Sequence, residues 1–282
     1  MPELPEIEGL RAALAESLAG RSVGSAAVRQ FALVKTFDPP LEALVGCAFT
    51  GTRRHGKHLL LDLGELTVAI HLGIGGRLVP LPAGKKPPRS TSLELGLDDG
   101  TSLSVVELGT KKRSSVHVLH GMDVSAHVAH LGVDALDEGF TTERLADLLA
   151  AESHQLKRFL CDQRRVAGIG NAYSDEILWE ARLPPLKLTG TLDDEDVARL
   201  HAVIGTVLRA ATERARHDNY LLIPRGDKRG SFQVHRRDKE ACPRCGEPIA
   251  SIFYEESSLQ YCPACQAEGR RYADRRRSRL FK

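Results

Sequence analysis

The sequence contains no apolar run of about 18 residues, the length that a membrane-crossing helix needs. Its N-terminus has no basic segment followed by an apolar core, so a secretory signal is not expected. No segment recurs at a fixed period. These absences argue against a membrane protein, a secreted protein and a repeat array. They favour a cytoplasmic protein whose thiols stay reduced.

The chain also has little excess charge, because its net charge is only +2 over 282 residues. The distribution is uneven. Arg225 to Lys282 contain 14 basic and eight acidic side chains, a net charge of +6, against −4 for the first 224 residues. A basic C-terminal segment is typical of a protein with an anionic partner, but a solvated charged surface gives the same count. The apolar fraction of 42% is sufficient for one large or two medium domains.

Cysteines are few, and four of the six cluster late as Cys242-Pro-Arg-Cys245 and Cys262-Pro-Ala-Cys265. Two such pairs place four soft ligands around one tetrahedral ion, for which Zn²⁺ is the best fit. Because four thiolates leave no open coordination position, one structural zinc ion is predicted. That ion would supply the folding free energy that so small a module cannot obtain from a core.

Apolar periodicity divides the chain into regions. Residues 5 to 18 have helical spacing, whereas residues 22 to 120 hold short apolar runs broken by glycine and proline, typical of a sandwich or barrel. After about residue 135 the helical period returns in four segments. Ser153 is predicted to cap the second of them, and the third is predicted from about Tyr173 to Ala181.

The remaining segments give three further expectations. Residues 218 to 240 are polar and contain glycine, so a linker is predicted there. Ile249 to Phe253 and Leu259 to Tyr261 are predicted to pair as a hairpin between the cysteine pairs. Cys47 and Cys161 lie in apolar contexts and are expected to pack in cores.

The first residues, Met1-Pro2-Glu3-Leu4-Pro5, allow an unusual chemistry. If Met1 is removed, Pro2 presents a secondary amine that can attack an aldehyde-like carbon to form an iminium ion. An α-amino group titrates near pH 7.7–8.0, so part of it is unprotonated at neutral pH. Glu3 would stand beside it as an acid or base. Alternatively, Pro2 only favours methionine removal and Pro5 starts a helix.

Two further patterns are compatible with anion binding. Val166-Ala-Gly-Ile-Gly-Asn171 lies between two predicted helices. There Gly168 and Gly170 allow a tight turn whose amides approach a phosphate, and Asn171 adds a side-chain amide. A glycine-rich helix connection with Asn171 as N-cap explains the same residues. Lys57 at the entry to a strand can reach a phosphate or be merely solvated, and His71 can bind phosphate or a backbone group.

Taken together, these elements resemble the formamidopyrimidine-DNA glycosylase/endonuclease VIII family over nearly the whole chain, and six elements in one order are more specific than any single one. The matching elements are Pro2 to Glu6, Gly56-Lys57, His71-Leu72-Gly73, Asp162-Gln163 with Val166 to Asn171, Asp175 to Leu178, and the four-cysteine finger.

The resemblance implies an α+β multidomain fold. Residues 1–130 would form the catalytic domain, an N-terminal helix with a β-sandwich. Residues 135–225 would form a helix–two-turns–helix DNA-binding domain, and residues 232–282 a zinc-finger β-hairpin with a basic tail. The implied partner is damaged double-stranded DNA bound by a monomer in the cytoplasm, associated with the nucleoid when on DNA.

The resemblance also implies base-excision repair by a bifunctional glycosylase and lyase. A damaged base is flipped out, the Pro2 nitrogen attacks the deoxyribose C1′, and β- and δ-elimination then cut the strand. Glu3 would protonate the sugar ring oxygen. Lys57, with a possible part in proton transfer, and Asn171 would hold phosphates. His71, Gly168 and Gly170 join these DNA contacts.

The sequence departs from the family pattern in the parts that choose the substrate. Ser257 stands where the family finger usually presents an arginine, beside Glu255 and Glu256. Ile74 replaces the usual methionine wedge. The later intercalating loop has Lys112 and Arg113 in place of an aromatic motif, and residues 219–230 differ from the linker that holds oxidised purines.

These departures leave two hypotheses. Retention of Pro2, Glu3, Lys57 and Asn171 favours an active glycosylase and lyase. Loss of the finger arginine and of the usual wedge is the basis of the alternative, a protein of the same fold that binds damaged or branched DNA without excising bases. A zinc-finger regulator is disfavoured, because no segment resembles a major-groove recognition helix.

Overall fold

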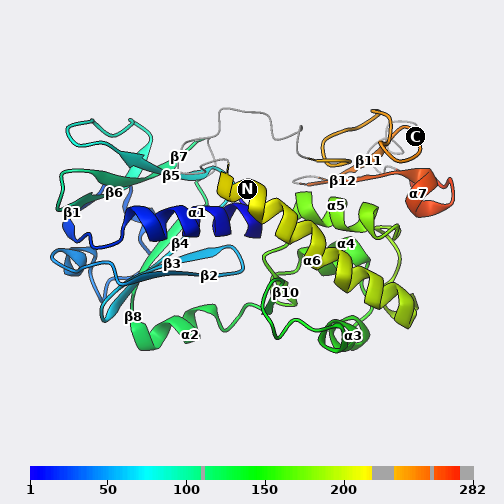
Figure 1. Cartoon of the computed structure of the whole chain (residues 1–282), viewed down its shortest axis with the longest axis horizontal. Helices are drawn as coiled ribbons and strands as arrows, with labels where there is room; N and C mark the ends of the chain where they lie inside the picture. The colour runs from blue at the N-terminus through cyan, green and yellow to red at the C-terminus, as the bar shows by residue number, and fades with distance from the viewer. Residues whose placement is uncertain (109–111, 218–231, 255–256, 274–282) are drawn as a thin grey trace. The chain divides into compact units, whose positions relative to one another are not determined.

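The structure, a computed structural model, describes residues 1–108, 112–217, 232–254 and 257–273. The chain divides into two compact units, the first comprising Met1–His130 and Ala211–Arg225 and the second Leu131–Ala210 and Gly226–Lys282. The first is rich in strands, and the second contains most of the helices and a C-terminal hairpin (Figure 1). The predicted α+β class is therefore confirmed.

The first unit is a sandwich of two four-stranded sheets, as predicted. Strands are ordered β1-β6-β7-β5 in one sheet and β2-β3-β4-β8 in the other, and every pairing within them is antiparallel. The strands are β1 (Val23–Val28), β2 (Gly51–His55), β3 (His58–Leu63), β4 (Leu66–His71), β5 (Gly76–Leu81), β6 (Thr91–Leu97), β7 (Ser102–Glu107) and β8 (Ser115–His120). Between them lie the short 3₁₀ turns η1 (Phe31–Leu33) and η2 (Leu41–Leu44), and after β8 come η3 (Gly121–Asp123) and helix α2 (Val124–Val128).

The core of this unit follows from strand alternation. On β3, Leu59, Leu61 and Leu63 point into the sandwich, whereas His58 and Leu60 lie on the opposite face. Helix α1 (Leu4–Ser17) adds its apolar stripe to the same core: Ile7, Leu10 and Leu14.

Polar and close-packed contacts fix α1 in place. Arg54 on β2 lies 3.2 Å from the Glu8 carboxylate, and Arg216 at the end of α6 (Asp194–His217) reaches the same carboxylate at 3.4 Å. Burial opposes ionisation of Glu8, but Arg11 and Arg54 lower its pKa below the ordinary value. A Cβ at Gly9 would lie 2.8 Å from the Ala215 carbonyl carbon, so glycine allows the two helices to touch.

The second unit contains a small parallel strand pair, β9 (Val133–Asp134) with β10 (Val166–Ala167), and several helices. The helices are α3 (Thr142–Ala151), α4 (Leu156–Cys161), α5 (Asn171–Glu180) and α7 (Pro263–Ala267), with the turn η4 (Thr189–Thr191) before α6. The predicted hairpin is present as β11 (Ala250–Phe253) and β12 (Ser258–Tyr261), paired antiparallel.

The prediction that Ser153 caps α4 is wrong. The N-cap residue is Gln155, whose side chain makes no capping hydrogen bond. Backbone groups satisfy the first turn instead, since the amides of Leu156 and Lys157 donate to the carbonyls of Lys187 and Pro185.

The linker prediction is wrong for residues 232–240, whereas residues 218–231 lie outside the described part of the chain. Phe232, Val234 and His235 are buried. The polar composition was misleading because the backbone amides of Gln233, Val234 and His235 donate hydrogen bonds to the buried Glu176 carboxylate. Cys47 is half-buried and packs against the sandwich core, as expected. Cys161 is half-buried as well, with its Sγ 3.4 Å from the Gly170 carbonyl oxygen.

The outer face of the β2-β3-β4-β8 sheet carries an unexpected group of imidazoles under α2. We call His58, His71, His117, His127 and His130 the histidine cluster. Burial, with a smaller contribution from neighbouring His71, lowers the pKa of His58 to about 3. Burial and neighbouring His127 lower the pKa of His117 to about 4. Both rings are therefore neutral at neutral pH.

The histidine cluster predicts acid-sensitive stability. An unfolded imidazole takes up its proton near pH 6.5, whereas folded His58 resists protonation down to about pH 3. The contribution of neutral His58 to the free energy of unfolding is therefore complete above pH 6.5, and it is lost as the pH falls toward 3. Between pH 7.5 and 5.0 the free energy of unfolding from urea titration should fall by about 2 kcal/mol more in the wild type than in His58→Gln.

His120→Gln is the matched control for this prediction, because His120 is an exposed histidine at the end of β8. It should lose stability on acidification as the wild type does. Equal pH dependence in the wild type and His58→Gln would contradict the assignment.

Candidate active site and metal centre

The N-terminus of α1 holds the first two candidate catalytic residues. Glu3 is the N-cap residue and is 4% exposed, and its amide donates to Glu6 Oε2 at 2.8 Å. Pro2, the preceding residue, is half-buried. The chain terminus is therefore attached to a helix whose apolar face lies in the core, which restricts where a Pro2 amine can be.

Lys57 lies in the tight turn between β2 and β3. The turn requires Gly56 at φ +55°, and Arg54 Nη1 donates to the Gly56 carbonyl at 3.0 Å. Because Arg54 also pairs with Glu8 on α1, one guanidinium ties this turn to the helix that carries Pro2 and Glu3. Lys57 is only 5% exposed, so it is not the solvated surface lysine of the alternative interpretation.

His71 ends β4, where it stands directly opposite His58 in the antiparallel register. Burial and the nearby Lys57 charge lower the pKa of His71 below its ordinary value. At neutral pH His71 is therefore a neutral imidazole, able to donate one hydrogen bond and to accept another.

The structure brings the loop of Ile74 against the loop of Lys112 and Arg113. Leu108 N donates to the Gly75 carbonyl at 2.9 Å, and a Cβ at Gly73 would lie 2.5 Å from the Arg113 carbonyl oxygen. Ile74 remains 50% exposed at the tip of its loop.

The second of these loops is fastened to the end of β7. Glu107 Oε1 accepts from the Arg113 amide at 3.1 Å and the Ser114 amide at 2.9 Å, and Lys112 Nζ donates to the Glu107 carbonyl at 2.9 Å. Residues 109–111 of this loop lie outside the described part of the chain.

In the second unit, Gly168, Gly170 and Asn171 form the turn into α5. Gln163 holds this turn, because its Nε2 donates to the Ile169 carbonyl and its Oε1 accepts from the Gly168 amide at 3.0 Å. Glycine is needed at position 168 for a φ of +105°. The N-cap residue of α5 is Gly170 and Asn171 is the first helical residue, so the N-cap interpretation of Asn171 is wrong.

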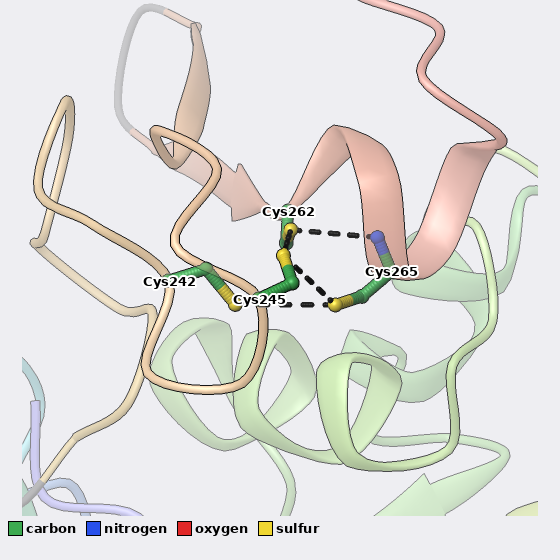
Figure 2. Close-up of side chains that lie close together, drawn as sticks. All are labelled: Cys242, Cys245, Cys262 and Cys265. Carbon is green, nitrogen blue, oxygen red and sulfur yellow. Dashed lines mark hydrogen bonds between the residues drawn. The ribbon is translucent and has the colours of Figure 1, made fainter.

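The four late cysteines converge on one point (Figure 2). Their ligand atoms all lie within 4.8 Å of one another, with Sγ–Sγ distances of 3.4 Å for Cys245–Cys262 and 4.0 Å for Cys242–Cys265. Four thiolates around a tetrahedral zinc ion stand about 3.8 Å apart. The spacing and the donor type therefore fit the predicted structural zinc ion.

Helix α5 contacts the segment that carries the first cysteine pair, Cys242 and Cys245. Trp179 Nε1 donates to Cys242 Sγ at 3.4 Å, and the Arg244 guanidinium stacks 4.0 Å from the Trp179 ring centroid. Arg244 also donates to the Glu180 carboxylate at 2.7 Å. Arg244 is thus engaged with α5.

A buried ionic network, missed by the sequence interpretation, joins α5 to the finger. Lys157 Nζ lies 2.7 Å from Asp175 Oδ1 and 2.9 Å from the Asn171 carbonyl, and the other Asp175 oxygen lies 2.8 Å from His235 Nδ1. Asp175 also accepts from the Gln260 amide on β12 at 3.2 Å.

The neighbouring carboxylate fixes the segment that precedes the finger. Glu176 accepts from the amides of Gln233, Val234 and His235 at 2.8–3.0 Å. Burial raises the pKa of Glu176 above its ordinary value, while those three amides oppose the shift. The signal in the sequence was the pair of adjacent acids in the helical segment from Tyr173 to Trp179, whose other residues are apolar except for Ser174.

The fold is thus a β-sandwich with an N-terminal helix, followed by a helical unit and a hairpin that carries a four-cysteine site of the zinc-finger type. The family model "Formamidopyrimidine-DNA glycosylase N-terminal domain" matches residues 1–111, and "Formamidopyrimidine-DNA glycosylase H2TH domain" matches residues 131–219. The chain belongs to the formamidopyrimidine-DNA glycosylase family.

Curated relatives agree with this assignment. The formamidopyrimidine-DNA glycosylase of Roseiflexus sp. is 36% identical and is aligned over 94% of this chain and 100% of its own. That of Symbiobacterium thermophilum is 34% identical over 94% of this chain and 89% of its own.

Solved structures give the same fold. The wild-type Lactococcus lactis enzyme bound to DNA with an oxidized pyrimidine is 26% identical, with a TM-score of 0.86 over 94% of this chain and 100% of that one. The same enzyme bound non-covalently to DNA with an AP site is 25% identical, with a TM-score of 0.84 over 94% of this chain and 99% of that one. Within the described residues, no helix combines the length and the apolar character that crossing a membrane requires.

The ionic network predicts a large loss of stability on Asp175→Asn. Asp175 is 1% exposed, so the substitution leaves the Lys157 charge buried without its counter-ion. The free energy of unfolding should fall by about 3 kcal/mol or more in urea titrations. Glu195→Gln removes the exposed ion pair with Arg199 on α6 and should change it by less than about 1 kcal/mol. Equal effects of the two substitutions would contradict the role of the network.

Removing the metal should detach the hairpin from α5. In a module this small the binding free energy of the ion is also the folding free energy. Trp179 is the only tryptophan and contacts Cys242, so chelation should change its fluorescence. Metal analysis should give about one zinc ion per chain in the wild type and in Cys161→Ala, and much less in Cys245→Ala. Full zinc content in Cys245→Ala would rule out the four-thiolate site.

Proposed function

We propose that this chain removes damaged bases from double-stranded DNA and then cuts the strand, with the Pro2 nitrogen as nucleophile. The observation that carries the proposal is the fixed position of its N-terminus. Glu3 caps a helix anchored in the sandwich core, and Arg54 joins that helix to the turn of buried Lys57. A nucleophile attached to a rigid element loses little freedom on reaching its target.

The proposed chemistry requires removal of Met1, which makes Pro2 a secondary amine. Its nitrogen attacks the deoxyribose C1′, and the bond from C1′ to the damaged base breaks. Glu3 protonates the ring oxygen as the sugar opens, which leaves an iminium ion on Pro2. The iminium withdraws electrons from C2′, so a C2′ proton is lost and the 3′-phosphate leaves by β-elimination. Loss of the 5′-phosphate by δ-elimination completes the cut.

The remaining candidates would hold the DNA. Lys57, His71 and Asn171 are proposed to contact phosphates around the lesion, with Gly168 and Gly170 shaping the turn before α5. Because the Gly168 amide already bonds to Gln163, its proposed part is to set the backbone conformation. Lys57 is also a candidate for proton transfer, since it is buried in the turn that Arg54 joins to the helix carrying Pro2 and Glu3.

The loop of Ile74 and the loop of Lys112 and Arg113 are proposed to fill the gap left by the flipped base. Flipping a base costs a few kcal/mol, which a side chain inserted into the stack can offset. Ile74 is proposed as the apolar wedge because it is half exposed at a loop tip, and Lys112 and Arg113 are proposed to meet the backbone beside it.

The domain organisation predicted from the sequence is part of this proposal. Residues 1–130 would act as the catalytic domain, 135–225 as the helix–two-turns–helix domain and 232–282 as the finger. The chain would act as a monomer in the cytoplasm, associated with the nucleoid when on DNA.

One observation favours the second candidate function, damage-specific binding without excision. Ser257, at the position of the usual finger arginine, is exposed, and its carbonyl accepts from the Tyr254 amide. No cation therefore stands at that position to hold phosphate or to assist δ-elimination.

Borohydride trapping on a duplex with one abasic site separates the two functions. The iminium form should be reduced to a stable covalent adduct by the chain that starts at Pro2. A chain with extra residues retained before Pro2 has no amine there and should give no adduct. The matched control carries the same residues at the C-terminus and should trap as the wild type does.

Zinc content and binding to an uncleavable abasic analogue should be the same for all three proteins. If the N-terminally extended chain traps as well as the wild type, Pro2 is not the nucleophile. If none of them traps although all bind DNA, the binding-only function is correct.

A further inference from the structure

The histidine cluster belongs to the first unit, whereas the cysteines belong to the second, and it has no part in the proposed chemistry except through His71. His58 and His71 stand opposite each other on β3 and β4, and His117 on β8 lies opposite Ala69 of β4. Helix α2 covers this face, since Val124 packs on Leu60 and Ala69. His127 on α2 thereby faces the sheet histidines.

The ring spacing is compatible with imidazoles that share a metal ion. The ring centroids of His117 and His127 are 4.4 Å apart, and those of His58 and His127 are 5.8 Å apart. Two imidazoles bound to one tetrahedral ion through Zn–N bonds have ring centres about 5 Å apart. The observed distances lie on either side of this value.

Two ring nitrogens in the cluster are buried without hydrogen-bond partners among the described residues. They are His58 Nδ1 and His127 Nε2. A buried polar atom without a partner is uncommon and calls for an explanation such as an ion. Both belong to rings at the centre of the cluster.

We propose that the histidine cluster binds one divalent transition-metal ion, held by His117 and His127, with water completing its coordination. Nitrogen donors without thiolate select ions such as Ni²⁺, Cu²⁺ and Zn²⁺ over Mg²⁺ or Ca²⁺. Two protein ligands suit this cluster because, within the described residues, only the four cysteines form a group of three or more possible metal ligands. The site is therefore weaker than the structural zinc centre.

Lys35 allows a test in which the direction of the change in metal affinity is predicted. It belongs to the segment that runs beside β8, where its amide donates to the carbonyl of Val116, the residue next to His117. Its charge therefore lies near the proposed ion. Removing this charge should strengthen metal binding, whereas a merely structural cluster gives no such response.

The test is calorimetric titration of the zinc-loaded full chain with Ni²⁺ at pH 7.5. We expect one saturable Ni²⁺ per chain, with no release of zinc. His117→Asn and His127→Asn should each raise the Kd about tenfold or more, and Lys35→Gln should lower it several-fold. His120→Asn, which removes an exposed histidine of the same strand, should leave the Kd unchanged.

Urea midpoints measured for every variant show whether a lost site reflects lost folding. If His117→Asn is unfolded, His127→Asn on the covering helix decides, since its exchange leaves the sheet intact. The proposal is overturned if Ni²⁺ gives no saturable binding, if folded His117→Asn and His127→Asn both bind as the wild type does, or if zinc leaves as nickel enters.

Discussion

Burial of one face of α1 in the sandwich core is the constraint on which the proposed chemistry depends. Chain termini usually fray, and a frayed terminus could not present an amine at a defined point. Here Leu4, Ile7 and Leu10 are all less than 5% exposed. The Glu8 carboxylate forms ion pairs with Arg54 and Arg216, which come from other segments. The first helix is therefore part of the core, and the two residues before it inherit its position.

In the second unit, a metal ion and buried charges hold the finger in a fixed position. Its finger is too small to fold on apolar burial alone, so four thiolates supply the missing free energy. The finger would still be free to move without an attachment to α5. Asp175 and Glu176 provide that attachment by accepting from amides on β12 and on the preceding segment. A single helix thus begins at the turn with Asn171 and ends beneath the metal centre.

The sequence predicted those features whose cause is local. Glycine-broken apolar runs predicted a sandwich or barrel, helical spacing predicted the helices, and paired Cys-x-x-Cys spacing predicted the zinc centre. It failed where distant groups meet. Residues 232–240 look like a linker until the Glu176 carboxylate binds their amides, and Lys157 gives no sign of its partner Asp175. The histidine cluster arises only from strand register, because His58 and His117 come from strands that lie far apart in the chain.

The central claim, that the Pro2 nitrogen is the nucleophile, is tested most directly by locating the bond to DNA. The borohydride-reduced adduct with an abasic duplex can be digested, and its peptides sequenced by mass spectrometry. The account predicts that the sugar remnant is on the ring nitrogen of the N-terminal peptide that begins at Pro2. A remnant on a lysine side chain such as Lys57, with the N-terminal peptide unmodified, would contradict it.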